Sequence, residues 1–382
     1  MKIVQIITRG NLLAGAQTHV IELSIALKER GHEVFVLCGN PQKIQERLKS
    51  EKEITFIPLK KLGRSINPFS DIAAYLELRN LLQQIQPDVV AAHSSKAGLL
   101  SRLVCHKLNI PNTFTVHGWS FTDGIPMVKK AIFLRVEKLA GKFSKMLFTT
   151  AMADRELGLK YNIVPADKIV NIYNGVLDRK SQKRPVTERK TVKICMAARF
   201  NPQKDHFTLI EALQQLQHLD WELNLLGGGS LMEEVKLQVK QCNLESRINF
   251  HGEVENVYDH LNDSDCFALI TNWEGFPFSI LEAMVHSLPI IATDVAGVRE
   301  SVRNNQNGFL VKRGDVEATK SALEKIITDV ELRQNFGKNS RKLYEENFTM
   351  EVMVDNILMN YQKLVDKSSP NKLVIEVTLV NS

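Results

Sequence analysis

Two glutamates eight positions apart mark the stretch with the clearest chemical character. Glu274 and Glu282 flank Gly275, Phe276 and Pro277, between an apolar run and a helical pattern. A strand that ends in a loop and leads into a helix presents N–H groups without intrahelical partners, and the helix dipole is positive at that end. Such helix starts bind anions. We therefore predict that this stretch binds a diphosphate.

Two carboxylates at this spacing do not fit the acid and nucleophile of a hydrolase. Eight residues of helix would separate them by roughly 12 Å along the axis and about 80° around it. The carboxylates of glycoside hydrolases lie only about 5 to 10 Å apart. With Glu274 in a loop and Glu282 in the helix, the two side chains suit different parts of one elongated ligand. Carboxylates accept hydrogen bonds from hydroxyl groups, so a sugar and a ribose are natural partners.

Basic and histidine side chains follow other predicted strands. Arg199 ends one strand and Lys204 precedes the next helix, and with the helix start near Ser279 they could neutralise two phosphates. His117 ends another strand and precedes Gly118, which lets the chain approach a ligand closely. Each residue alone could be a solvated or structural side chain. Their shared position at strand ends favours a binding site.

The common cofactor motifs are missing from the sequence. Gly227-Gly-Gly229 follows a strand, but Met232 occupies the place of the third glycine in a dinucleotide loop. The chain also lacks the G-x-x-x-x-G-K-[ST] pattern of a P-loop. Neither a redox cofactor nor ATP-driven chemistry is therefore expected.

Length and composition are those of a globular protein with two domains. The 382 residues exceed one ordinary core, and no apolar run reaches the roughly 18 residues of a membrane span. The start of the chain shows no cleavage site, so we expect a cytoplasmic protein. The five cysteines are scattered, which indicates neither disulfides nor a zinc site. The net charge of +6 permits an anionic substrate or membrane surface, and no nucleic acid partner is expected.

Strands alternate with helices along the chain, which predicts parallel, doubly wound sheets with right-handed crossovers. In the first half we expect strands at 2–8, 33–37, 55–58, 88–92, 112–116 and 146–150, and helices at 18–30, 71–85, 97–108 and 128–139. In the second half we expect strands at 192–197, 222–226, 248–251, 266–270 and 289–293, and helices at 208–216, 231–241, 257–261 and 279–287.

This alternation predicts an α/β protein of two Rossmann-like domains that face a central cleft. Residues 1–176 form the first domain, the charged segment 177–191 a linker, and residues 192–349 the second domain. The chain is helical from 316 to 364, and its last helix, at 350–366, is expected to cross back to the first domain before a tail at 367–382. Such sheets bind ligands at the carboxyl ends of their strands, so we expect the site in the cleft.

Several of these residues form motifs that resemble glycosyltransferase family 4, whose members are retaining enzymes of the GT-B fold. The E-x7-E motif of the family corresponds to residues 274–282, and family-like segments follow at 283–284, 289–294 and 307–311. Segment 14–17 resembles the family's Gly-Gly loop, although Ala14 replaces the usual first glycine. Segments 30–34 and 174–176 also match, and the resemblance covers nearly the whole chain.

The resemblance implies how a nucleotide-sugar donor would be held. Arg199 and Lys204 would bind the donor diphosphate, together with the segment 275–277. Glu282 would bind the nucleotide ribose, and Glu274 the sugar hydroxyls. The first domain would bind the acceptor and the second domain the donor.

The resemblance also implies the remaining site residues and the absence of a cofactor. His117 would lie beside the reacting sugar, and Gly15 would let its loop approach donor and acceptor. Members of the family need no metal. Asp263-Ser-Asp265 has the spacing of a metal-binding D-x-D, but it immediately precedes a buried strand and is interpreted as a structural turn. We therefore expect neither a metal nor another cofactor.

Segments 92–98 and 116–119 resemble members that build capsular or exopolysaccharide repeats on a lipid-linked acceptor. The expected reaction moves a hexose or N-acetylhexosamine from a nucleoside diphosphate sugar, with a UDP-sugar as the expected donor. Six basic residues between Val128 and Lys145 alternate with apolar ones. Such a helix can lie on the anionic inner face of the cell membrane, and an ordinary solvated helix face is the alternative.

Two other functions fit the same motifs. A nucleotide-sugar epimerase of GT-B fold would isomerise its substrate without an acceptor. A non-catalytic subunit that binds a nucleotide-sugar would regulate a partner. The intact set of candidate side chains argues against the second alternative.

Overall fold

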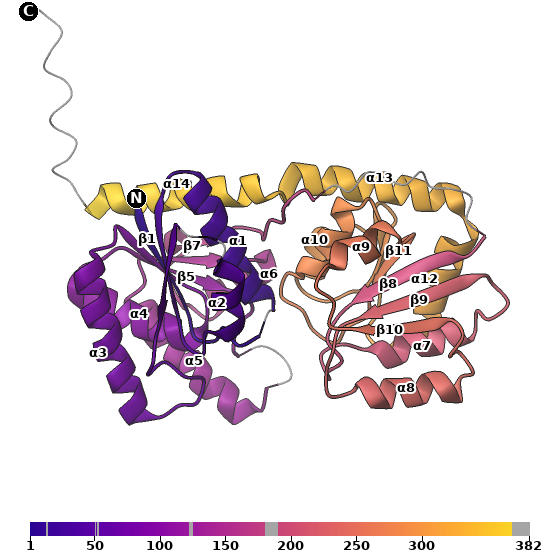
Figure 1. Cartoon of the computed structure of the whole chain (residues 1–382), viewed down its shortest axis with the longest axis horizontal. Helices are drawn as coiled ribbons and strands as arrows, with labels where there is room; N and C mark the ends of the chain where they lie inside the picture. The colour runs from indigo at the N-terminus through magenta and orange to yellow at the C-terminus, as the bar shows by residue number, and fades with distance from the viewer. Residues whose placement is uncertain (13, 50, 52, 122–124, 180–189, 369–382) are drawn as a thin grey trace, which may run out of the picture. The chain divides into compact units, whose positions relative to one another are not determined.

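The computed structural model describes residues 1–12, 14–49, 51, 53–121, 125–179 and 190–368. The chain forms two compact units (Figure 1). The first unit combines Met1–Asn174 with the chain from Met350 onward, and the second is Gly175–Thr349. Most of the predicted linker 177–191 and nearly all of the predicted tail 367–382 lie outside the described residues.

The first unit is built around a parallel sheet of seven strands in the order β3-β2-β1-β4-β5-β6-β7. Its strands are β1 (Lys2–Ile7), β2 (Glu33–Cys38), β3 (Ile54–Pro58), β4 (Val89–Ala92), β5 (Asn112–Val116), β6 (Met146–Thr149) and β7 (Ile169–Asn171). The central strands β1, β4 and β5 are almost wholly buried, so both faces of the sheet are covered.

Helices cover the two faces of this sheet. They are α1 (Gly15–Glu29), α2 (Gln42–Leu48), α3 (Pro68–Ile85), α4 (Ser95–Leu108), α5 (Met127–Gly141), α6 (Met152–Lys160) and α14 (Met350–Ser368), with the 3-10 helix η1 (Ala166–Lys168). Right-handed crossovers place α1 and α2 on one face and α3, α4 and α5 on the other. The last helix, α14, contacts α1 and β4, and Tyr361 stacks on Phe148 with 6.0 Å between ring centroids. The expected return of the last helix to the first domain is therefore observed.

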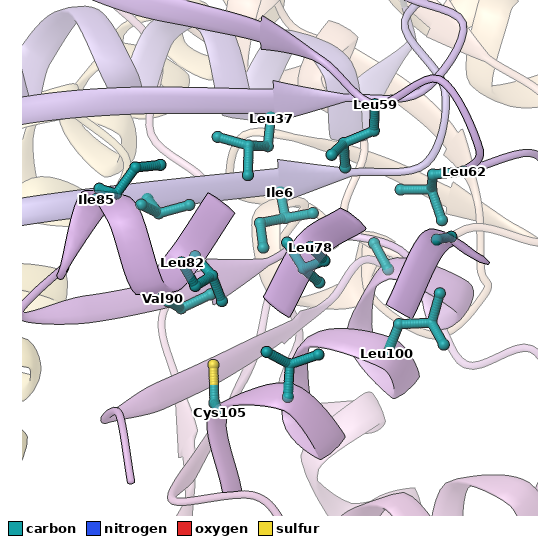
Figure 2. Close-up of a cluster of buried hydrophobic side chains, with 14 residues drawn as sticks. Ile6, Leu37, Leu59, Leu62, Leu78, Leu82, Ile85, Val90, Leu100 and Cys105 are labelled. Atoms are coloured by element: carbon teal, nitrogen blue, oxygen red, sulfur yellow. The ribbon is translucent and has the colours of Figure 1, made fainter. Parts of the chain in front are cut away.

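The face that carries α3 and α4 holds a large apolar core. Leu78, Leu82 and Ile85 recur at helical spacing on α3 and pack toward the sheet, where they meet Ile6 and Val90 (Figure 2). This pattern buries one stripe of α3. The opposite side of the same helix leaves apolar side chains in solvent, at residues 69, 72 and 76.

The second unit contains a parallel sheet of six strands in the order β10-β9-β8-β11-β12-β13. Its strands are β8 (Val192–Ala197), β9 (Trp221–Leu226), β10 (Ile248–Gly252), β11 (Cys266–Leu269), β12 (Ile290–Thr293) and β13 (Gly308–Val311). Its helices are α7 (His206–Gln214), α8 (Met232–Gln241), α9 (Val257–Asn262), α10 (Phe278–Val285), α11 (Val298–Ser301), α12 (Val316–Thr328) and α13 (Val330–Asn347). The predicted doubly wound architecture is confirmed in both units.

The structure adds short elements that the sequence pattern did not predict, namely α2, α6, β7, α11 and β13. Strand β13 starts at a glycine for a steric reason. A Cβ atom on Gly308 would lie 2.0 Å from the carbonyl oxygen of Ile290 on the neighbouring strand. The close approach of two backbones thus selects glycine in a strand, where local propensity disfavours it.

A buried ion pair joins α4 to α5. The Nη2 atom of Arg102 lies 2.9 Å from Oε2 of Glu137, and the two side chains are 0% and 3% exposed. The guanidinium also donates to the carbonyl of Gly98 at 2.8 Å and lies 4.4 Å from the ring centroid of Phe114. Because both charges are out of water, each depends on the other.

Replacing Glu137 with alanine should destabilise the protein strongly. The variant leaves the Arg102 guanidinium buried without its counter-charge, which costs about 3 to 5 kcal/mol. Urea unfolding followed by circular dichroism measures the loss. Glu156 on α6 is exposed, and Glu156→Ala should change stability by less than about 0.5 kcal/mol. Equal stability of the two variants would contradict the prediction.

Candidate functional site

In the second unit, the loops after β8 and β11 are joined by hydrogen bonds. These strands are neighbours in the sheet, so their carboxyl ends lie side by side. The amide of Asp205 donates to the carbonyl of Ile270 at 3.0 Å, and the amide of Asn272 donates to the carbonyl of Gln203 at 2.7 Å. The two loops therefore form one fixed surface.

Glu274 is held on this surface by three side chains. Its Oε1 accepts a hydrogen bond from Oγ1 of Thr271 at 2.9 Å, and its Oε2 accepts one from Nε2 of Gln203 at 3.3 Å. The ammonium of Lys204 forms an ion pair with Oε1. The side chains of Lys204 and Glu274 are 12% and 7% exposed. We predicted both residues as site residues, and the structure brings them into direct contact.

Arg199 and Glu282 occupy different positions around this pair. Arg199 lies just after β8 with an exposed side chain, and no ion pair to it is formed within the described residues. Glu282 lies within α10 and is half-buried, whereas Glu274 lies in the loop before that helix. The expected division of the two glutamates between loop and helix is therefore observed.

The segment 275–277 offers backbone rather than side chains to an anion. The ring of Phe276 is buried against Phe348, with 5.4 Å between centroids. Pro277 is the N-cap of α10 and has no N–H to donate. A diphosphate at this helix start would therefore rely on the amides of the loop and of the first turn.

The glycine run after β9 has a packing role. Gly227 and Gly229 have φ values of +135° and +154°. A Cβ atom would lie 2.3 Å from the carbonyl oxygen of Ala198 in the first case and 2.2 Å from that of Phe200 in the second. The run lets this loop press against the chain on both sides of Arg199, which explains the glycines without a dinucleotide.

In the first unit, three histidines meet at the carboxyl edge of the sheet. His93 follows β4, His117 follows the neighbouring strand β5, and His19 lies near the start of α1. The ring centroids of His19 and His117 lie 4.8 Å apart, and those of His93 and His117 lie 5.6 Å apart. We define these three residues as the histidine cluster.

Two carboxamides orient the histidine cluster. The Nε2–H group of His93 donates to Oε1 of Gln5 at 2.5 Å. The Nδ1–H group of His19 donates to Oδ1 of Asn174 at 3.2 Å. The unprotonated Nδ1 of His93 then faces Nε2 of His117 at 3.4 Å. The Nε2 atom of His19 is buried and has no hydrogen-bond partner in the part of the chain that the structure describes.

Burial keeps the histidine cluster neutral. It lowers the pKa of His19 to about 4, although the hydrogen bond that His19 donates to Asn174 opposes this shift. Burial also holds the pKa values of His93 and His117 well below the ordinary range, and the nearby His19 lowers them further. At neutral pH the cluster therefore presents uncharged donors and acceptors.

The position of Gly15 in the first unit differs from the expected one. We expected this residue in the loop, but it is the first residue of α1 and is exposed. Ala14, the N-cap, has an extended backbone with φ −145° and accepts the first helical hydrogen bond from Thr18. Alanine fits this conformation without strain, so the departure from the usual glycine is tolerated.

Sequence reasoning missed His19 and His93 as site residues. His93 stands in the segment 92–98 that we had matched to polysaccharide-building enzymes, directly after a predicted strand, so the strand-end criterion applied to His117 would have found it. His19 stands inside a helical pattern, and nothing local distinguishes it from a core histidine.

Two family models match consecutive parts of the chain. The model of glycosyltransferase family 4 matches residues 13–178, and that of glycosyl transferases group 1 matches residues 178–343. Among curated proteins, the chain is 28% identical over 370 residues to the UDP-Gal:alpha-D-GlcNAc-diphosphoundecaprenol alpha-1,3-galactosyltransferase of Escherichia coli, covering 93% of this chain and 95% of that protein. It is 27% identical to the putative glycosyltransferase EpsD of Bacillus subtilis, covering 86% and 89%.

Solved structures share the fold at lower identity. A glycosyltransferase from Rickettsia africae has a TM-score of 0.80 at 21% identity, covering 95% of this chain and 98% of that chain. HepE of Anabaena, solved in complex with UDP and glucose, has a TM-score of 0.81 at 17% identity, covering 94% and 99%. These likenesses identify the fold as GT-B.

Proposed function

Because the chain belongs to glycosyltransferase family 4, we propose that it is a retaining transferase that moves a hexosyl or N-acetylhexosaminyl unit from a UDP-sugar to a lipid-linked acceptor in surface polysaccharide biosynthesis. The E. coli relative carries UDP-galactose and a diphosphoundecaprenol-linked sugar in its name, which supports both substrate classes. The observation that carries the proposal is the ordered pair of Lys204 and Glu274 at the ends of β8 and β11.

The charges of the second unit suit a departing diphosphate. Breaking the bond to the anomeric carbon leaves negative charge on the diphosphate, and fixed cations lower the barrier by stabilising that charge. Arg199 is exposed and available to a ligand, and the ammonium of Lys204 has two further protons beyond the one directed at Glu274. The resemblance assigns the donor sugar to Glu274, the ribose to Glu282 and the backbone of 275–277 to the diphosphate.

Glu274 is suited to recognise sugar hydroxyls because it is already oriented. Thr271, Gln203 and Lys204 fix its carboxylate, so little conformational entropy is lost when a hydroxyl binds to its remaining lone pairs. In the first unit, His117 is the residue that the resemblance places beside the reacting sugar. Its neutral ring can accept or donate a hydrogen bond there.

We also propose that α5 rests on an anionic membrane surface. Its apolar residues 127, 128, 132, 136 and 139 are exposed, whereas Phe133 and Leu134 pack toward the core. The exposed row on α3 belongs to the same helix layer and adds apolar area. Basic side chains flank this row on α5, as in helices that lie in a membrane interface. Within the described chain, none of the helices has the length and apolarity needed to cross a bilayer.

Removing either donor cation should lower transfer by roughly 100- to 1,000-fold, as for other fixed donors to a developing negative charge. Arg199→Ala is the cleaner variant, because the side chain is exposed and makes no ion pair in the described part of the chain. Lys204→Ala should lower transfer as strongly, and it also removes the counter-charge of Glu274, so its melting temperature must be measured alongside.

The matched control for these variants is Lys240→Ala on α8, whose side chain is exposed. Transfer is measured as sugar incorporated into an undecaprenyl-diphosphate-linked acceptor from a series of nucleotide-sugars. Turnover of Arg199→Ala and Lys204→Ala equal to that of Lys240→Ala would remove the diphosphate clamp from the mechanism. Isomerised donor without acceptor would indicate an epimerase instead.

We expect transfer to proceed fully in EDTA. The leaving diphosphate is neutralised by side chains and backbone amides in this proposal, so no divalent cation is required. Initial rates are compared with excess EDTA, with EDTA followed by excess Mg²⁺, and without additions. A rate that falls in EDTA and returns with Mg²⁺ would contradict metal-independent catalysis.

Charge reversal on α5 should release the protein from anionic vesicles. The triple variant Lys129→Glu, Arg135→Glu, Lys138→Glu removes attraction of about 1 kcal/mol per basic residue and adds repulsion. Co-sedimentation is measured with phosphatidylglycerol-containing and purely zwitterionic vesicles. The control variant, Lys236→Glu with Lys240→Glu, reverses the charge of two lysines on α8 in the second unit. Equal vesicle binding by both variants would exclude α5 as the contact.

A further inference from the structure

The histidine cluster converges on a single point in the first unit. One nitrogen from each of the three rings lies within 4.8 Å of one nitrogen from each of the others. His19 and His93 are 3% and 2% exposed, and His117 is half-buried. No carboxylate belongs to this group. The potential metal ligands of the cluster are therefore all imidazole nitrogens.

One ring nitrogen of the cluster, Nε2 of His19, is left without a hydrogen-bond partner among the described residues. His93 uses its N–H on Gln5, so its Nδ1 carries a lone pair, which accepts at most the 3.4 Å contact from Nε2 of His117. His19 uses its N–H on Asn174, which leaves a lone pair on a buried Nε2 atom that no described residue contacts by a hydrogen bond. Buried polar atoms without partners are uncommon in folded proteins and call for an explanation.

We propose that His19, His93 and His117 bind a divalent transition metal ion of the zinc class, with the fourth coordination position open to a small ligand. Imidazole nitrogens suit zinc, copper and nickel, whereas magnesium and calcium require oxygen ligands. Three histidines with an open fourth position are a known arrangement for zinc. The scattered cysteines gave no sign of such a site, because its ligands are histidines distant in sequence.

The geometry is close to that of a tetrahedral centre. Zinc–nitrogen bonds of about 2.0 to 2.1 Å place two ligand nitrogens about 3.4 Å apart. The Nδ1 atom of His93 and the Nε2 atom of His117 already lie 3.4 Å apart. The largest separation within the cluster is 4.8 Å, so a contraction of roughly 1 Å by rotation of one ring completes the set.

The outer hydrogen bonds match those of metal-bound histidines. A histidine that binds a metal through one ring nitrogen donates its other N–H to an oxygen acceptor, which fixes the ring and its tautomer. Oε1 of Gln5 and Oδ1 of Asn174 are such acceptors for two of the three rings. The inner nitrogens of His19 and His93 are thus oriented before any metal binds.

A zinc ion bound at the histidine cluster would inhibit sugar transfer. This consequence rests on the proposed function. A bound zinc ion would occupy the ring of His117 that is assigned to the reacting sugar. Binding of zinc and inhibition by zinc are therefore separate measurements. If no donor supports transfer, the proposed function fails while the zinc measurement still decides the site.

The test uses untagged, chelator-treated full-length protein, because an oligohistidine tag would itself bind zinc. Zinc is titrated in competition with a chromophoric chelator, and we expect one zinc ion per chain with micromolar affinity or tighter. Cobalt(II) replaces zinc in a parallel experiment, where the visible spectrum should have the intensity of a tetrahedral centre. Circular dichroism confirms that each variant is folded.

Variants separate this site from other histidines. His19→Gln and His93→Gln should each weaken zinc binding by more than roughly 100-fold, and Gln5→Leu by roughly 10- to 100-fold through loss of the outer hydrogen bond. The control is His251→Gln, whose exposed ring lies 4.5 Å from the half-buried ring of His260. It should keep the affinity of the unmodified protein. Absence of stoichiometric zinc, an octahedral cobalt spectrum, or unchanged affinity in His93→Gln would each overturn the proposal.

Discussion

The parallel hydrogen bonding of β8 with β11 is the constraint on which the candidate donor site depends. It places two strand ends side by side, and the loops that leave them pair through backbone amides. Only on this surface can Glu274 keep a charged carboxylate almost out of solvent, because Thr271, Gln203 and Lys204 surround it. An oriented carboxylate beside an ammonium discriminates between ligands by geometry as well as by charge. Ligand recognition in this unit therefore begins with the sheet.

How much of the fold could be predicted depended on the length of each element. Each long strand and helix was visible because its apolar residues recur with the period of one secondary structure. The short elements α2, α6, β7, α11 and β13 were not visible, because segments of three to nine residues carry too little periodicity to outweigh local composition. Gly308 shows the limit clearly: a side chain at this position would collide with Ile290 on another strand, which no local pattern reveals.

The sequence predicted which residues belong to the candidate site more fully than it predicted the contacts between them. Arg199, Lys204, Glu274 and Glu282 were selected by their position at strand and helix ends, and that criterion depends only on sequence order. The ion pair between Lys204 and Glu274 depends on strand order, because it joins residues 70 positions apart. His19 was missed for the same reason: its neighbours come from β4 and β5, which only the sheet brings beside α1.

The buried pair of Arg102 and Glu137 acts on the surface as well as on the core. It fixes the rotational phase of α5, since a shift of one residue turns a helix by about 100°. Such a turn would carry Lys138 toward the guanidinium and bring like charges together out of water. Ile132 and Val136 face outward because Glu137 cannot leave its partner. The direction in which the exposed face of α5 points is therefore set by a buried contact, whichever side chains that face carries.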